Sequence, residues 1–572
     1  MNSLASAVPY GPILNLYPDS LGGSLCDAAD FLELPEAEGV FSSLYILPSL
    51  FHSDLDRGFS IIDYGLNEAL ATGQDLARIR KSDVKLILDF VINHASVQSP
   101  QFRDILEKGD DSVYRDFFID WNRFWSGRGQ MNPEGYITPD PEAIKGMYLR
   151  KPGLPVLMVR FPDGRSVPFW NTFYQEIIYP AMDATALADA LQIPLSQASE
   201  LAGMINQALE QGLKPHEIDP EPYRQYRQPI IDLLESRSRY LGQMDLNIRS
   251  PLVWAYYRET LKTLAGYGAA IVRLDAFAYA SKEAGARNFL NEPGTWDLLR
   301  EIKSLASPDG LTLLPEVHAS YDEKLCDRLA EAGCLCYDFF LPGLVLDALE
   351  HGTGEYLLRW AMELYKKGIC AINMLGCHDG IPLLDLKGLL PEGRISSLID
   401  LVVARGGMVK NLHGQKEAYY QVNGTYFSAL GEDENKLLLS RALQLFMPGI
   451  PQIWYLDLFA GKNDHPAVTR HGSSGHKEIN RTNLSREEVL AGLGLPVARD
   501  QLKMIRFRGS FAAFHPDAAF DADEPSPGTV RFVWRYQGCS AALQADLKTG
   551  SFTMTGSGAS GDIVFAYSRS SS

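Results

Sequence analysis

Residues 271–280 read "IVRLDAFAYA", a run that combines the pattern of a buried β-strand with two opposite charges. Side chains alternate along a strand, so Arg273 and Asp275 share one face with Ile271, and aliphatic side chains fill the other face. Charge is costly to bury unless it is paired. The stretch therefore predicts a strand whose end carries either a structural ion pair or a functional site.

Seven other β-branched or aliphatic runs alternate with segments at helical spacing. With the first stretch, the predicted strands lie near residues 12–18, 42–49, 84–94, 269–276, 311–317, 334–342, 369–379 and 449–457. This alternation is typical of βα units around a parallel sheet. No G-x-G-x-x-G run follows the first strand, so the pattern favours an α/β fold with a closed (β/α)₈ TIM barrel over an open doubly wound sheet.

The spacing of the strands predicts how the chain is divided into domains. The barrel is expected at residues 1–130 and 245–504, with a lid-like excursion at about 380–448. The gap after strand three is too long for one helix, which predicts an inserted domain at 131–244 with a helical extension at 183–240. Short alternating runs beyond residue 505 predict a C-terminal antiparallel β-domain at 505–572.

The composition describes an acidic protein of ordinary hydrophobicity. The 572 residues are 46% hydrophobic and 22% charged, with a formal net charge of −18. Excess negative charge opposes binding to nucleic acid or to anionic membranes, so neither is an expected partner. The first residues lack the pattern of a signal peptide and no apolar run is long enough to span a membrane, which predicts a cytoplasmic location.

Polar residues follow several predicted strands at the ends where βα loops begin. Strand three is followed by Asn93 and His94, strand four ends at Arg273 and Asp275, strand five leads to Glu316 and His318, and strand seven leads to His378 and Asp379. In a parallel barrel these ends meet at one face. One such residue is often only a cap or an ion-pair partner, but the four coincidences together predict a cleft with three carboxylates.

Paired carboxylates in a cleft favour chemistry on glycosidic bonds. One carboxylate attacks the anomeric carbon while the other protonates the leaving oxygen, and retention requires the two to lie about 5–5.5 Å apart. The two groups need different pKa values. We expect Arg273 to keep Asp275 ionised as the nucleophile, and neighbouring negative charge to keep Glu316 protonated as the acid.

Several motifs resemble those of a known superfamily. The runs "DFVINH" (89–94), "VRLDAFAYA" (272–280), "PEVH" (315–318) and "CHDG" (377–380) are similar to the four sequence blocks of the α-amylase superfamily, glycoside hydrolase family 13. Within it, stretches such as "DRGFSIIDY" (56–64) and "KEINRTN" (477–483) resemble the sucrose phosphorylases. The resemblance covers about residues 15–500 apart from the 183–240 insertion.

The resemblance implies roles for individual residues. Asp275 would be the nucleophile, Glu316 the general acid/base and Asp379 the stabiliser of the transition state. Residues that would bind substrate are Asp56, Phe59, His94, Arg273, His378 and Arg481 around the glucosyl ring, and Lys151, Tyr279, His318, Tyr420 and Gln421 near the acceptor.

The expected reaction is double displacement with retention: sucrose and phosphate give α-glucose 1-phosphate and fructose through a β-glucosyl ester of Asp275. Inorganic phosphate would be a co-substrate, and no cofactor or metal is expected. Cations that would attract phosphate are Arg481, Lys151 and a protonated His318. Because the family includes homodimers, a homodimer stays an open alternative.

Three other functions remain open at this point. "DRGF", with Arg57, is closer to phosphorylases that act on sucrose 6'-phosphate, glucosylglycerol or glucosylglycerate than to those that act on sucrose. A sucrose hydrolase or transglucosylase would use the same carboxylates. A catalytically idle sugar-binding scaffold would be expected to lack them.

Overall fold

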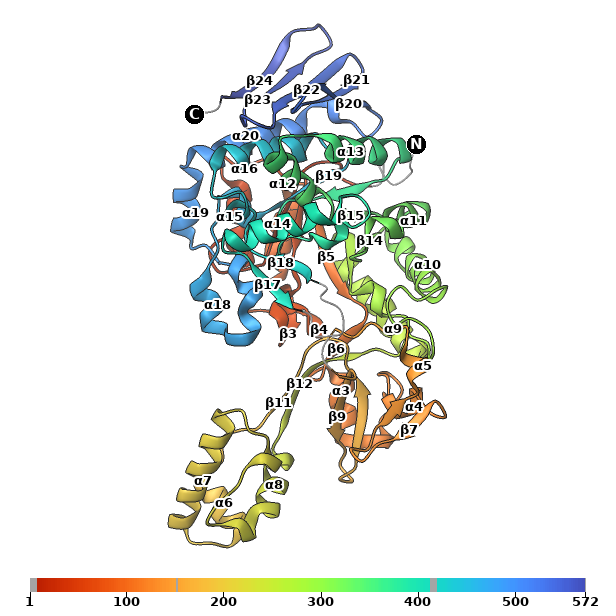
Figure 1. Ribbon diagram of the computed structural model, residues 1–572, viewed down its shortest axis with the longest axis vertical. Coiled ribbons are helices and arrows are strands. Elements are labelled where there is room, and N and C mark those ends of the chain that lie inside the picture. Colours follow the sequence, from red (N-terminus) through yellow and green to blue (C-terminus); the bar gives the residue numbers. More distant parts are fainter. Residues whose placement is uncertain (1–7, 151–152, 412–418, 571–572) are drawn as a thin grey trace. The chain divides into compact units, whose positions relative to one another are not determined.

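Eight parallel strands form the barrel, as the sequence predicted. The computed structural model describes residues 8–150, 153–411 and 419–570 (Figure 1). The barrel strands are β1 (Ile13–Leu16), β2 (Ser43–Ile46), β5 (Lys85–Val91), β13 (Ala269–Asp275), β14 (Thr312–Pro315), β15 (Cys336–Asp338), β16 (Ala371–Asn373) and β19 (Ile450–Trp454). They pair in the order β14-β13-β5-β2-β1-β19-β16-β15.

A backbone contact joins the two ends of this sheet. The Leu335 amide, next to β15, donates to the carbonyl of Leu313 in β14 at 3.1 Å. Short runs such as Ile13–Leu16 are buried along their whole length, as expected where a parallel sheet is covered on both faces. The TIM barrel is therefore confirmed.

The opening stretch is a strand only as far as Asp275. Ala276 has φ +52°, and residues 277–279 form one turn of 3₁₀ helix. A non-glycine residue in this left-handed region costs about 1–2 kcal/mol and interrupts an extended chain. The strand predicted at 269–276 therefore ends one residue earlier than expected, and the remainder of the stretch to Ala280 is not extended.

Helices cover the outside of the barrel. Those between barrel strands are α1 (Leu25–Glu33), α2 (Gly73–Lys81), α9 (Pro251–Tyr267), α10 (Gly294–Ala306), α11 (Leu325–Glu331), α12 (Leu341–His351), α13 (Glu355–Lys367) and α14 (Glu392–Ala404). After β19 come α17 (Tyr455–Leu458), α18 (His465–His471), α19 (Arg486–Leu493) and α20 (Pro496–Ser510). A hairpin of β3 (Phe51–Ser53) and β4 (Ile61–Leu66) follows β2.

The excursion predicted at 380–448 is only partly a surface feature. It contains α14, the paired strands β17 (Met408–Asn411) and β18 (Tyr419–Asn423), α15 (Tyr426–Ala429) and α16 (Glu434–Phe446). Residues 437–446 of α16 are all buried, so this last part of the excursion belongs to the core of the barrel's outer layer.

The chain ends in an antiparallel sheet, again as predicted. Its strands, in spatial order, are β20 (Ala519–Ser526), β21 (Thr529–Tyr536), β22 (Cys539–Asp546), β23 (Phe552–Ser557) and β24 (Ile563–Arg569). The buried Trp534 indole of β21 donates to the Phe446 carbonyl at the end of α16 at 2.9 Å. The sheet is thereby fixed to the barrel's helical layer.

Residues 95–138 and 155–245 form a second compact unit, whereas the sequence placed the inserted domain at 131–244. Its elements include α3 (Pro100–Lys108), α4 (Trp121–Phe124), β7 (Gly129–Met131), β9 (Val156–Arg160), β10 (Ser166–Trp170), β11 (Gln175–Ile178) and β12 (Arg239–Asp245). In sequence, strand β8 (Ile137–Pro139) spans the end of this unit at residue 138, and α5 (Pro141–Ile144) belongs to the first unit.

Three helices in the second unit have a core of their own. They are α6 (Ala184–Leu191), α7 (Leu195–Glu210) and α8 (Arg227–Ser236), which lie together in Figure 1. The buried side chains of this core, from the helices and the segments beside them, are Met182, Leu187, Ala198, Leu201, Ala202, Ile205, Ile218, Ile230 and Leu234. No helix in the described part of the chain is both long and apolar enough to cross a membrane.

Because this helical core is small, the loss of one buried side chain should measurably destabilise it. Replacing the fully buried Leu201 with alanine should destabilise α6–α8 by about 2–5 kcal/mol, because it removes apolar contacts and leaves a cavity. Limited proteolysis should then cut faster within residues 183–240. The exposed neighbour Gln197→Ala serves as the control, and equal cleavage rates in both variants would contradict the prediction.

Candidate active site

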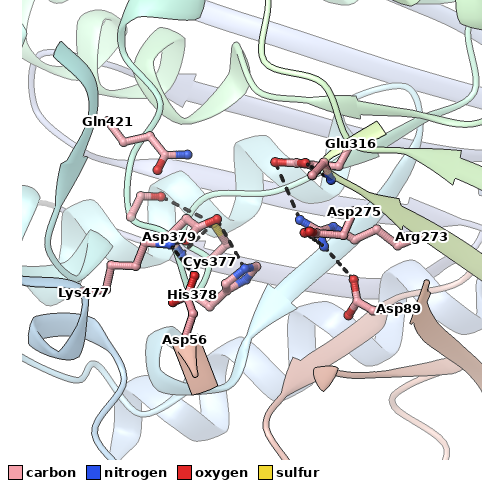
Figure 2. Close-up of polar contacts among 12 residues, drawn as sticks. Asp56, Asp89, Arg273, Asp275, Glu316, Cys377, His378, Asp379, Gln421 and Lys477 are labelled. Atoms are coloured by element: carbon pink, nitrogen blue, oxygen red, sulfur yellow. Dashed lines mark hydrogen bonds and ion pairs between the residues drawn. The ribbon is translucent and has the colours of Figure 1, made fainter. Parts of the chain in front are cut away.

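A small hollow lies at the carboxyl ends of the barrel strands. Its lining residues are Tyr45, Arg273, Glu316, His318, Tyr337, Phe339, Met374, Cys377, His378, Asp379 and Gln452. Figure 2 shows Asp275, Glu316 and Arg273 on one side, with Asp379, Asp56 and Lys477 on the other. The structure thus brings the three predicted carboxylates into one site.

Arg273 joins three carboxylates from three neighbouring strands. Its Nη1 donates to Asp89 Oδ1 at 2.5 Å and to Asp275 Oδ1 at 2.8 Å, while Nη2 lies 3.7 Å from Glu316 Oε1. The arginine side chain is only 3% exposed. Because one guanidinium contacts both Asp275 and Glu316, the two predicted reacting groups face the same small volume.

The strand register explains why these groups meet. Arg273 of β13 lies directly opposite Asp89 of β5, and the Tyr45 hydroxyl of β2 donates to both Asp89 oxygens at 3.1 and 3.0 Å. Asp89 is fully buried and does not line the hollow. It therefore anchors the arginine, which in turn contacts Asp275 and Glu316.

The bend after β13 positions Glu316. The Ala276 amide donates to Glu316 Oε2 at 3.1 Å, and it can do so because Ala276 has turned out of the strand at φ +52°. Residues in sparsely populated backbone regions concentrate at functional sites, where the surrounding structure holds them. Here the strained residue lies directly after the predicted nucleophile.

The charge balance around Asp275 differs from the expectation. Burial raises the pKa of Asp275 to about 8 although Arg273 lowers it, and the negative charges of Glu316 and Asp89 raise it further. Arg273 was expected to dominate, but it is shared with Asp89 and cannot neutralise both carboxylates. The carboxyl of Asp275 therefore holds its proton up to about pH 8, instead of being kept ionised by Arg273 as expected.

Asp379 lies among positive charges on the opposite side. Lys477 Nζ is 2.8 Å from Asp379 Oδ1 and 3.5 Å from Asp56 Oδ2, and Arg481 lies 3.4 Å from Asp379 and 3.6 Å from Asp56. Although burial raises it, His378, Lys477 and Arg481 hold the pKa of Asp379 well below its usual range. Asp379 is therefore ionised at any working pH, as a group that stabilises positive charge must be.

His378 and Phe59 form a stacked pair beside Asp379. Their ring centroids are 5.1 Å apart at an interplanar angle of 14°, and His378 Nε2 lies 3.3 Å from Asp379 Oδ2. Burial lowers the pKa of His378 to about 3, so its imidazole is neutral. His94, in β6 (His94–Ser96), contacts the Phe59 carbonyl at 3.0 Å through Nε2. Phe59, His94 and His378 thus lie in contact with one another at the predicted glucosyl site, while their roles in binding glucose stay predictions.

The loop that carries Asp56 is tied to the loop that carries Arg481. Arg57 donates to the Arg481 carbonyl at 2.6 Å and to both Asp19 carboxylate oxygens at 3.2 Å, and lies 4.1 Å from the Tyr17 ring centre. Asp56 and Arg57 both have positive φ. The next residue must be glycine: Gly58 has φ +114°, and a Cβ there would meet the Ser49 backbone nitrogen at 2.1 Å.

Arg481 does not suit its predicted second use as a cation for phosphate. Its side chain is 1% exposed, and its Nε donates to the His378 carbonyl at 2.8 Å. Its other nitrogens face Asp379, Asp56 and Glu478. The guanidinium is committed to the glucosyl side of the site.

The predicted acceptor residues lie on the Glu316 side. His318 is buried with Nε2 3.5 Å from Glu316 Oε1 and 3.1 Å from the Gln421 side-chain amide. Tyr279 is buried, and its hydroxyl accepts a hydrogen bond from Arg150 at 3.1 Å. Lys151 and the side chain of Tyr420 lie outside the described residues.

The side-chain oxygen of Asn93 accepts a hydrogen bond from a buried lysine. Lys282 Nζ donates to Asn93 Oδ1 at 2.9 Å and to the Tyr279 carbonyl at 2.6 Å, and the lysine is 5% exposed. In the described part of the chain, no group of three or more histidine, cysteine or acidic residues could hold a metal ion.

Sequence reasoning missed two charged residues of the site. Lys477 begins the stretch "KEINRTN", four residues before Arg481, and that spacing was a usable signal. Asp385 lies six residues after Asp379 in "HDGIPLLD", and a single acidic residue in a loop gives no signal of a buried ion pair.

Comparisons with known proteins agree with this geometry. The family described as "Alpha amylase, catalytic domain" matches residues 41–142. The chain is 46% identical to a sucrose 6(F)-phosphate phosphorylase of Ilumatobacter coccineus, over 96% of this chain and 97% of that protein. It is 29% identical to a sucrose phosphorylase of Streptococcus mutans, over 91% and 92% of the two chains.

A solved structure matches the whole chain. The crystal structure of sucrose 6F-phosphate phosphorylase from Thermoanaerobacter thermosaccharolyticum superposes with a TM-score of 0.80 at 31% identity, covering 99% of each chain. The chain therefore belongs to the sucrose phosphorylase-like enzymes of the α-amylase superfamily, glycoside hydrolase family 13.

Proposed function

We propose that this enzyme is a retaining α-glucoside phosphorylase that transfers glucose from sucrose 6F-phosphate or sucrose to inorganic phosphate. The observation that carries the proposal is the single guanidinium of Arg273 between Asp275 and Glu316, at the mouth of a barrel whose opposite wall holds the ionised Asp379. Two neighbouring carboxylates, one to attack the anomeric carbon and one to protonate the leaving oxygen, are what double displacement requires.

In the first step Asp275 attacks the anomeric carbon as the bond to the fructosyl oxygen breaks. Glu316 gives its proton to that oxygen, and a β-glucosyl ester forms on Asp275. Positive charge develops on the ring, and the nearby carboxylate of Asp379 stabilises it.

In the second step a phosphate oxygen attacks the same carbon from the vacated side. The ester bond to Asp275 breaks and the carboxylate is restored, while Glu316 accepts the proton of the incoming phosphate. Two inversions give α-glucose 1-phosphate with net retention.

The relatives favour the phosphorylated donor over the sucrose first expected from the sequence. Both the 46% identical relative and the 31% identical solved structure are named for sucrose 6F-phosphate, whereas the sucrose phosphorylase is 29% identical. "DRGF" also favours this choice. We infer further that no metal takes part, since the double displacement described above needs only the carboxylates. We also infer that the enzyme acts in the cytoplasm.

The donor panel tests the proposal directly. With phosphate present, sucrose 6F-phosphate should give glucose 1-phosphate with the highest kcat/KM, ahead of sucrose, glucosylglycerol and glucosylglycerate. Each donor is also incubated without phosphate as a control. Free glucose as the main product at saturating phosphate would identify a hydrolase, and no product from any donor would favour a binding scaffold.

Substitution of the two carboxylates should separate their roles. Asp275→Asn should lower turnover about 10⁴-fold or more with every donor, because the nucleophile is lost. Glu316→Gln should lower it about 10²–10⁴-fold with sucrose 6F-phosphate, but much less in the first step with α-glucosyl fluoride, whose leaving group needs no proton. Equal losses with both donors in Glu316→Gln would contradict the assignment of the acid.

The pH dependence follows from the raised pKa of Asp275. Because the carboxyl of Asp275 holds its proton up to about pH 8 and only the carboxylate can attack, kcat/KM for sucrose 6F-phosphate should rise as pH rises toward about 8. The same rise is expected with α-glucosyl fluoride, since both donors need the same nucleophile. A kcat/KM that does not rise toward pH 8 with either donor would contradict the interpretation.

A further inference from the structure

His318 is held on three sides at the acceptor end of the site. Its ring stacks on Phe339 with centroids 3.9 Å apart and an interplanar angle of 21°. Its Nδ1 lies 2.7 Å from Asp385 Oδ2, and its Nε2 is directed to Glu316 and Gln421. The side chain is 3% exposed, so these contacts fix both the plane and the direction of the imidazole.

Asp385 lies outside the hollow, in the 3₁₀ helix Leu384–Leu386 that follows the loop of Asp379. Its carboxylate is 7% exposed and contacts the far nitrogen of His318. A carboxylate on Nδ1 keeps a proton there, which leaves Nε2 to meet whatever binds beside Glu316. Its direct hydrogen-bond contact with the site is thus His318.

The charges that face His318 favour its protonated form. Although burial lowers it, Asp385, Glu316 and Asp379 raise the pKa of His318 above its ordinary value. Two further neighbours, Gln421 and Phe339, are uncharged. The Gln421 amide can offer its oxygen to an imidazolium or its N–H to a neutral imidazole, so it tolerates both states.

This geometry places a group that can carry positive charge directly beside Glu316. Phosphate must approach an ester flanked by Glu316 and Asp379, yet Arg273 is used by Asp89 and Asp275, and Arg481 and Lys477 by Asp379 and Asp56. Arg150 donates to the Tyr279 hydroxyl on the same side, whereas His318 Nε2 lies 3.5 Å from Glu316 Oε1 and so meets the acceptor next to the acid/base.

We propose that Asp385 is a positioning residue that directs His318 toward the acceptor and keeps it as the cation that meets the incoming phosphate. The inference rests on the proposed phosphorylase function and assigns to the Asp385–His318 pair the preference for phosphate over water.

The test compares phosphate with water as acceptor in Asp385→Asn. Asparagine keeps a hydrogen bond to Nδ1 but removes the charge, so the ratio of glucose 1-phosphate to glucose formed should fall about 10- to 100-fold at neutral pH, the factor that a charge-assisted hydrogen bond represents. The KM for phosphate should rise, and its increase with pH should begin at lower pH than in the wild type. Asp385→Glu should restore part of the ratio.

Two further measurements separate positioning from a general loss of structure. His318→Gln should lower the ratio as Asp385→Asn does, and the double variant should lose little more, since both act through one group. Histidine NMR should show the His318 resonance, identified by its loss in His318→Gln, titrating at lower pH in Asp385→Asn. Asp347→Asn, which removes the partner of His351 at 3.1 Å, should leave the ratio unchanged.

The outcomes distinguish this inference from the function it rests on. A wild-type enzyme that forms only glucose in saturating phosphate contradicts the proposed function and the inference with it. A wild type that forms glucose 1-phosphate, with an Asp385→Asn variant of unchanged ratio and unchanged His318 titration, overturns the inference alone, as do additive losses in the double variant.

Discussion

The site depends on one arginine that is shared by more carboxylates than it can neutralise. Arg273 contacts Asp89, Asp275 and Glu316 from within a buried strand. A fully matched ion pair would hold Asp275 as an inert carboxylate, and a missing arginine would leave the buried acids protonated. Sharing gives an intermediate state, in which burial raises the pKa of Asp275 to about 8 although Arg273 lowers it. The pairing of β13 with β5 in the barrel makes this sharing possible, because its register places Arg273 opposite Asp89.

Positive charge is divided between two walls of the hollow. Lys477 and Arg481 serve the wall with Asp379 and Asp56, where glucose is expected to bind. The imidazole of His318 serves the wall with Glu316, where the leaving group and phosphate are expected. If the proposed function holds, this division would let a protein with a net charge of −18 accept an anion, because the local field differs from the average one.

Much of the fold and part of the site could be predicted from sequence. All eight barrel strands were located because aliphatic runs of this length are rare outside buried strands, and Asp275, Glu316 and Asp379 were found because each follows such a run. The left-handed turn at Ala276 was not predicted, since an alanine gives no sign of such a backbone. The balance of charge at Asp275 was also missed, because it depends on Asp89, which is 186 residues away in sequence and adjacent only through strand pairing.

The contact between Lys282 and Asn93 has a consequence for how the acceptor side is held together. The ammonium binds the loop after β5 to the carbonyl of Tyr279 after β13. A bound ion in that place would leave the protein in proportion to its dissociation constant and the composition of the surroundings. A cation that is covalently part of the chain has no such equilibrium, so this cross-link persists at any dilution and in the presence of any chelator.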